Sequence, residues 1–128
     1  MTQDEAAAHW QQRARSELKA ARILFEKEEP DVYGEVLFHC HLAIELALKA
    51  RYIREKNAAA PFTHDLSELA EELQIEWTSD EQEDFDEITD FGTLSRYGGQ
   101  QWFASNATKE NAEYYVQKAE QFLSKVLS

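Results

Sequence analysis

The stretch that most constrains the fold runs from residue 33 to residue 55 and reads YGEVLFHCHLAIELALKARYIRE. It contains no proline and only one glycine, and most of its residues favour helix. Two apolar sets recur at three- and four-residue steps on different sides of the same helix. One set contains Val36, Cys40, Ala43, Ile44, Ala47 and Leu48, and the other contains Phe38, Leu42, Leu46 and Ile53. A helix that is apolar around most of its circumference must be covered on most sides, so we expect it at the centre of a helical bundle.

Helical periodicity continues on both sides of this stretch. Residues 3–29 carry one apolar stripe, and Pro30 ends that helix. A loop with Pro61 leads to a helix over residues 64–74, for which Thr63 is the expected cap and Asp65 lies in the first turn. Thr78 or Ser79 opens a helix over residues 81–93 through a capping box. We therefore expect short connections and antiparallel neighbours.

Glycines interrupt the pattern towards the end of the chain. Gly92 and the pair at 98–99 bracket the sequence LSRY, which indicates a loop, and an irregular segment follows up to residue 107. Thr108 or Asn106 caps the last helix. With no strand alternation anywhere, the sequence predicts an all-α, antiparallel up-and-down bundle of four to five helices in a single domain, residues 1–128.

Charge and composition narrow the classes of function. The 25 acidic and 13 basic residues give a formal net charge of −12, which disfavours general nucleic-acid binding. No apolar run reaches the roughly 18 residues of a membrane span. The N-terminus lacks a signal pattern, and one cysteine, Cys40, cannot form an internal disulfide. We expect a cytoplasmic protein without a membrane segment.

Three pieces of the chain, in this order, resemble the HEPN family of small helical domains. The first is the opening pair of helices, with Trp10 ahead of FHCHLAIELALKA at residues 38–50. The second is the sequence His-Asp-Leu at residues 64–66, and the third is Arg96-Tyr97 before the last helix. The resemblance implies an antiparallel helical bundle that usually dimerises. It also implies, for some members, pairing as a toxin with a minimal nucleotidyltransferase (MNT) antitoxin.

Many HEPN proteins are implicated as metal-independent ribonucleases that use an Arg, four to six residues, and then a His. No arginine of this chain is followed by a histidine at that spacing. Arg96 leads instead into YGGQQWF, which holds no side chain suited to be a general base. This departure from the family pattern argues against the nuclease activity that the resemblance implies. No catalytic residue is assigned.

The central helix carries a polar stripe at i, i+4 and i+8, formed by His41, Glu45 and Lys49. These side chains either line a pocket, with Glu45 and Lys49 binding a ligand, or form an exposed or interfacial ion pair in the favourable Glu-to-Lys orientation. His39, Cys40 and His41 point about 100° apart on a helix and cannot converge on one ion. His41 and Glu45 offer two ligands, but the third, His64, would have to come from elsewhere in the chain, so no metal or other cofactor is expected.

Two further candidates come from the loops. His64 beside Asp65 either forms a ligand-binding imidazole–carboxylate pair or packs near the loop while Thr63 and Asp65 cap the helix. Arg96 and Tyr97 either present a guanidinium and a ring to an anionic, planar ligand such as a nucleotide, or pin their loop. In the second case Arg96 pairs with nearby acids such as Asp84, Asp86 or Asp90.

Leucine at positions 42 and 46 departs from the HEPN pattern that the chain resembles, because family members usually have polar residues at these positions. Together with Phe38 and Ile53, these side chains indicate an apolar surface that is hidden in a homodimer or partner interface. Three hypotheses follow. In the first, the chain is a nuclease-silent HEPN-like module that dimerises and binds an MNT-type partner or a small nucleotide. In the second, it is a diverged ribonuclease toxin that uses Arg96 with a distant base such as His64. In the third, it is a purely structural oligomerisation subunit.

Overall fold

The computed structural model describes residues 1–127. Within that range the chain forms six α-helices and one 3₁₀ turn and contains no strand. The elements are α1 (Gln3–Glu26), η1 (Pro30–Val32), α2 (Tyr33–Lys56), α3 (Leu66–Glu71), α4 (Ser79–Tyr97), α5 (Gln100–Asn106) and α6 (Lys109–Leu127). The all-α prediction is confirmed, with one or two more helices than expected.

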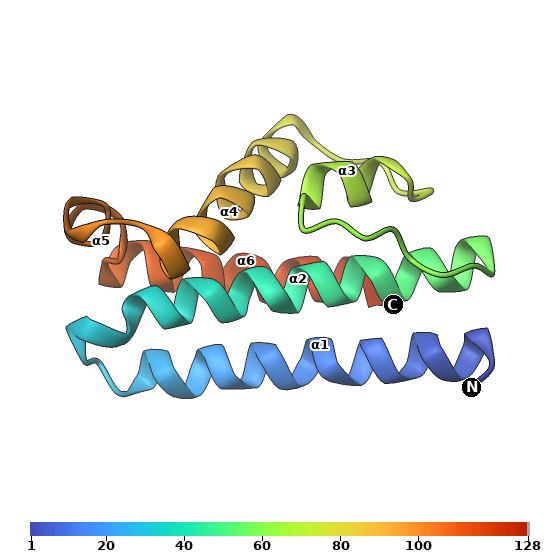
Figure 1. Cartoon of the computed structure of the whole chain (residues 1–128), viewed down its shortest axis with the longest axis horizontal. Helices are drawn as coiled ribbons and strands as arrows, with labels where there is room; N and C mark the ends of the chain where they lie inside the picture. The colour runs from blue at the N-terminus through green and yellow to red at the C-terminus, as the bar shows by residue number, and fades with distance from the viewer. Residues whose placement is uncertain (128) are drawn as a thin grey trace.

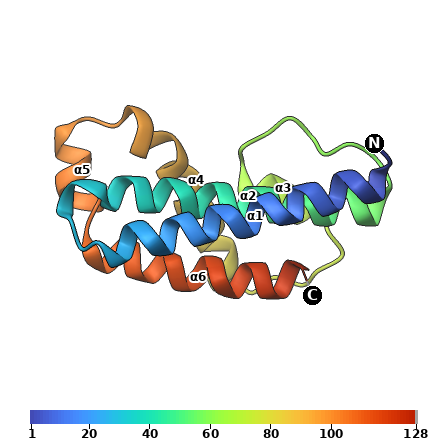
Figure 2. The ribbon, with the colours of Figure 1, turned by 90° about the horizontal axis from the view of Figure 1, so that it is seen from below.

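Helices α1, α2 and α6 lie along one another, with α1 antiparallel to the other two, and α4 runs back steeply across α2 (Figure 1). The short helices α3 and α5 lie in the connections before and after α4 (Figure 1). Seen from below, α1 lies against both α2 and α6 along most of its length (Figure 2). None of the helices over residues 1–127 is long and apolar enough to cross a membrane.

Helix α2 is central, as the sequence predicts. It packs against α1, α6, α4 and α3, and 15 of its 24 residues are buried. Six of its apolar residues have no measurable exposure, namely Val36, Leu37, Cys40, Ala43, Ile44 and Leu48. Burial of one such large side chain stabilises the fold by roughly 1.5–3 kcal/mol, so α2 organises the core.

The ends of two helices differ from the sequence prediction. Helix α1 ends at Glu26 and not at residue 29, because Glu28 turns into the left-handed region with φ 53°. Helix α3 covers only Leu66–Glu71, and its N-cap is Asp65 and not Thr63. The Asp65 carboxylate accepts the backbone N–H groups of residues 67 and 68, while the Thr63 hydroxyl accepts the N–H of Asp65.

The predicted loop around Arg96 is helical. Helix α4 begins at the expected capping box of Thr78 and Glu81, passes through Gly92 and ends at Tyr97. A Cβ atom at Gly92 would lie 2.7 Å from the ring of His41, so the missing side chain lets α4 approach α2. Glycine marks a close helix contact here and not a break.

The segment expected to be irregular also contains a helix. Residues Gln100–Asn106 form α5, and its Phe103 ring packs onto Gly34 at the start of α2. Thr108, one of two predicted caps for the last helix, accepts the N–H of Asn111. The glycines of this region therefore separate two helices that share one end of the bundle.

Candidate functional site

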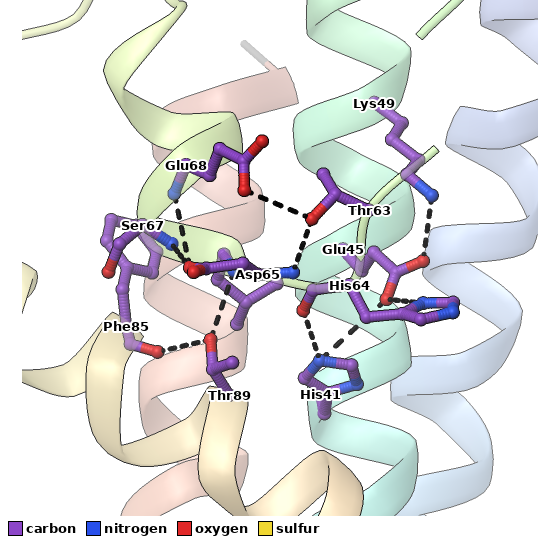
Figure 3. Close-up of polar contacts among 11 residues, drawn as sticks. His41, Glu45, Lys49, Thr63, His64, Asp65, Ser67, Glu68, Phe85 and Thr89 are labelled. Carbon is purple, nitrogen blue, oxygen red and sulfur yellow. Dashed lines mark hydrogen bonds and ion pairs between the residues drawn. The ribbon is translucent and has the colours of Figure 1, made fainter. Parts of the chain in front are cut away.

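The polar stripe of α2 is buried. His41 and Glu45 are each 4% exposed and Lys49 is 8% exposed, although all three are polar. The segment around His64, which leads into α3, covers the stripe (Figure 3). The Glu45–Lys49 ion pair that the sequence offers is present at 3.0 Å, but it is buried and not exposed.

The Glu45 carboxylate is the centre of this cluster (Figure 3). Its Oε2 accepts a hydrogen bond from Lys49 Nζ at 3.0 Å, and its Oε1 accepts one from His64 Nδ1 at 2.9 Å. His41 Nε2 lies 3.7 Å from the same Oε1. A buried carboxylate needs such donors, because leaving it unpaired costs several kcal/mol.

His41 is held in one tautomer. Its Nε2–H donates to the backbone carbonyl of His64 at 3.0 Å, and a carbonyl can only accept. Burial lowers the pKa of His41 below its ordinary value of 6.5, and this outweighs the opposite effects of the His64 carbonyl and of Glu45. His41 Nδ1 is buried without a partner in the described chain, and Gly92 covers it. The imidazole is neutral near pH 7.

His64 differs from His41 in exposure, since 79% of its side chain is accessible. Its Nδ1 bonds Glu45, so Nε2 is the ring nitrogen left for a ligand. An imidazole that donates through Nδ1–H carries its lone pair on Nε2, which can accept a hydrogen bond. The buried carboxylate therefore orients an accessible imidazole.

Thr89 on α4 fixes the position of this covering segment. Its hydroxyl accepts the Leu66 N–H at 3.0 Å and donates to the carbonyl of Phe85 at 2.7 Å (Figure 3). Sequence reasoning missed Thr89 and Gly92 because nothing in the local pattern links α4 to residue 64 or to His41. Spacing within one helix carries no information on such contacts.

Arg96 lies in the last turn of α4 and faces α2. Its Cζ is 3.7 Å from the centroid of the Phe38 ring, and its guanidinium lies 3.6 Å from Glu35. The expected pairing with Asp84, Asp86 or Asp90 is not among these contacts, because Arg96 faces α2. Tyr97 follows with 86% exposure.

Two adjoining pockets meet at this cluster. The α2–α4 pocket has about 350 Å³ and is lined by Phe38, His41, Leu42, His64, Gly92, Thr93, Arg96 and Tyr97. The α1–α2 pocket has about 440 Å³, and its lining includes Trp10, Arg13, Leu42, Glu45, Leu46, Lys49, Ile53, Phe62 and His64. Leu42 and His64 belong to both and separate one pocket from the other.

The predicted ligand-binding residues therefore fall into two groups. Arg96, Tyr97 and His41 line the α2–α4 pocket, and Glu45 and Lys49 line the α1–α2 pocket. His64 joins them. No acidic side chain of the described chain lines the α2–α4 pocket, which is unusual in a protein of net charge −12.

The predicted interface residues are covered to different degrees. Leu46 and Ile53 are 4% and 3% exposed within the single chain, so they have little surface left for a second molecule. Phe38 and Leu42 are half-buried. An interface on this side of α2 stays a prediction, and Phe38 and Leu42 are the residues with surface to offer it.

Cys40 and His39 lie outside this site. Burial raises the pKa of the Cys40 thiol far above its usual range, so it does not act as a nucleophile near neutral pH. His39 Nδ1 bonds Glu17 on α1, on a different side of α2 from His41. Within residues 1–127, no three His, Cys, Asp or Glu side chains come together as a metal site.

Comparison with known proteins agrees with this architecture. The family model described as HEPN domain matches residues 7–128, nearly the whole chain. No curated protein and no solved structure gives a significant match. The hydrogen bond between His64 and Glu45 joins two of the pieces that carry the resemblance, the α2 sequence and His-Asp-Leu. The chain belongs to the HEPN family.

Proposed function

We propose that this protein is a nuclease-silent HEPN module that binds a small nucleotide in the α2–α4 pocket. The observation that carries the proposal is the set of side chains in that pocket. Arg96 supplies a guanidinium beside the Phe38 ring, and Tyr97 supplies an accessible ring next to it. A fixed cation and an aromatic face match the phosphate and the base of a nucleotide.

The electrostatics of the pocket support an anionic ligand. Three of its lining side chains carry nitrogen groups, namely Arg96, His41 and His64, and none of those that line it in the described chain is a carboxylate. Glu35 lies 3.6 Å from Arg96, and both side chains are more than 40% exposed, so this pair stabilises Arg96 only weakly. An incoming phosphate therefore competes with a weak partner.

The module acts, in this proposal, as a homodimer or with a protein partner of the MNT nucleotidyltransferase type. Family membership supports this, together with the half-buried Phe38 and Leu42 beside the pocket. The absence of a histidine at the family's nuclease spacing supports the nuclease-silent assignment. We expect the protein to work in the cytoplasm, since Cys40 has no partner cysteine.

The experiment is a titration with a fluorescent ATP analogue, with adenosine as the uncharged competitor. Wild-type protein is expected to bind the analogue, and Arg96→Ala is expected to weaken binding at least about tenfold, because a charge-assisted contact is lost. Arg22→Ala is the matched control, since Arg22 pairs with Glu120 far from the pocket. Equal affinity of both variants would contradict the proposal.

One observation favours the second candidate, a diverged ribonuclease. His64 and Arg96 line the same pocket, and Glu45 holds the imidazole with its Nε2 outward. Such a base could deprotonate an RNA 2′-hydroxyl while Arg96 neutralises the phosphate. RNA cleavage in EDTA that is lost in both His64→Ala and Arg96→Ala, with helical circular dichroism retained, would establish this function. A structural subunit alone would show neither binding nor cleavage.

A further inference from the structure

We infer that the α1–α2 pocket is a second binding site, which takes a small amphipathic carboxylate. The site lies on the other side of Leu42 and His64 from the proposed nucleotide pocket and does not depend on it. Its volume of about 440 Å³ falls in the range of pockets that hold small molecules.

The floor of the pocket offers hydrogen-bond donors. Only about 10% of the Lys49 side chain is exposed. Within the described chain, its Nζ donates one hydrogen bond, to Glu45. An ammonium has three donors, so Lys49 has two more to give. Glu45 already accepts from Lys49 and His64. The unmet need at the floor is therefore an acceptor.

Arg13 at the rim adds a second cation. It projects from α1 and lines the pocket, and no hydrogen bond or ion pair joins it to another residue within 1–127. The Lys49–Glu45 pair is neutral as a whole, so Arg13 gives the pocket its net positive charge. A carboxylate suits this set, because it can accept from both a guanidinium and an ammonium.

The rest of the pocket wall is apolar. It is formed by side chains from α1, α2 and the loop after α2, among them Trp10, Leu42, Leu46, Ile53 and Pro61. Phe62 stands at the edge with its side chain fully exposed. A ligand with an apolar body would bury the surface that Trp10, Leu42 and Pro61 still expose, together with part of the Phe62 ring. Removal of this apolar area from water favours binding.

A small carboxylate fits better than an apolar partner helix. A helix that covered the pocket with apolar side chains alone would remove Lys49 from water without offering its N–H groups an acceptor. Burial of such donors without partners costs several kcal/mol. The ligand must therefore carry its own acceptor, and the wall requires the remainder to be apolar.

Nuclear magnetic resonance titrations with sodium octanoate and with octanol test the site. Octanoate is expected to shift the Trp10 indole N–H signal and the amide signals of residues 59–64, and to bind at least about tenfold more tightly than octanol. Arg13→Gln is expected to weaken octanoate binding about threefold, as for an exposed ion pair. Arg15→Gln, on the same helix but outside the pocket lining, should leave it unchanged.

Lys49→Gln provides a second variant, which keeps an N–H donor but removes the charge. It should reduce octanoate affinity about tenfold and leave octanol affinity unchanged, with helical circular dichroism retained. Equal affinities for octanoate and octanol would overturn the inference. Chemical shift changes confined to other surfaces would also overturn it. So would a protein that sediments as a dimer and does not bind octanoate. The ATP-analogue titration of Arg96→Ala is separate from each of these results.

Discussion

The two sides of α2 are buried by different means. Towards α1 and α6 the helix presents small apolar side chains such as Ala43 and Ala47, which lie one turn from His39, bonded to α1, and from Arg51, bonded to α6. On its other side it presents His41, which faces Gly92 of α4, and Glu45 and Lys49, which line the α1–α2 pocket beside the segment before α3. These three side chains are almost as buried but are hydrogen-bonded. Apolar packing tolerates many alternatives of similar volume. The polar side accepts only a covering segment that satisfies its donors and acceptors.

The largest effect should come from removing the centre of the polar side. Glu45→Ala leaves the Lys49 ammonium buried without its partner and removes the acceptor of His64. We expect the free energy of unfolding to fall by about 3 kcal/mol, as for other broken buried pairs. Urea denaturation measures this loss.

The control for this prediction lies on the same helix. Glu55 also accepts from an arginine four residues away, Arg51, but nearer the helix end. Glu55→Ala should cost clearly less than Glu45→Ala, because water can reach the groups it leaves behind. Equal losses would mean that the polar side of α2 is not special.

The contact between α4 and the polar side can be tested with one methyl group. In Gly92→Ala the new Cβ would lie 2.7 Å from the His41 ring and would push the two helices apart. Alanine favours helix by about 1 kcal/mol over glycine, yet overpacking costs about 1–3 kcal/mol. We expect a net loss of about 1–2 kcal/mol in chemical denaturation.

Gly99→Ala is the matched substitution. No atom lies within 4 Å of a Cβ at that position, and its φ of −79° suits any residue. This variant should change stability by less than about 0.5 kcal/mol. A Gly92→Ala protein as stable as the wild type would show that α4 does not depend on its close approach to His41.

The polar side should also respond to pH. Burial lowers the pKa of His41 in the folded protein, so below its ordinary value of 6.5 the unfolded chain binds a proton that the folded chain does not. This stability contribution is complete above pH 6.5 and is lost as the pH falls from there. The slope from one such group is at most about 1.4 kcal/mol per pH unit.

Denaturation midpoints between pH 7.5 and 5 measure this slope, in a range where most carboxylates stay ionised. Glu45, Lys49 and His64 surround the imidazole, and the comparison with His41→Gln separates its contribution from theirs. The glutamine variant should have a flatter profile. A profile that is unchanged in that variant would assign the pH dependence to another group.

The same contrast explains what the sequence could predict. The apolar side follows from periodicity, because packing needs only side chains of suitable size at helical spacing. The capping box at Thr78 is equally local, and it was predicted correctly. Local sequence patterns therefore predict the order of the long helices and the apolar core.

The polar side depends on contacts between distant residues, and sequence patterns do not specify these. Glu45 and Lys49 are typical of an exposed pair until the segment at His64 covers them. Gly92 alone is typical of the end of a helix, and only the structure shows that it packs against His41, 51 positions earlier in the sequence. The sequence therefore suggests six candidate ligand-binding residues, but not that they line two adjoining pockets.

Among the substitutions that remove a contact of α2, Arg96→Ala should have the smallest effect on stability, which separates binding from folding. Its contact with the Phe38 ring and its 3.6 Å approach to Glu35 are both partly exposed, and such contacts contribute about 1 kcal/mol or less. Arg96→Ala should therefore unfold within about 0.5–1 kcal/mol of the wild type while losing most of its affinity for the ATP analogue. Arg22→Ala should match it in stability and keep that affinity. If Arg96→Ala instead lost as much stability as Glu45→Ala, the guanidinium would belong to the scaffold with Glu45, and the α2–α4 pocket would have no cation reserved for a ligand.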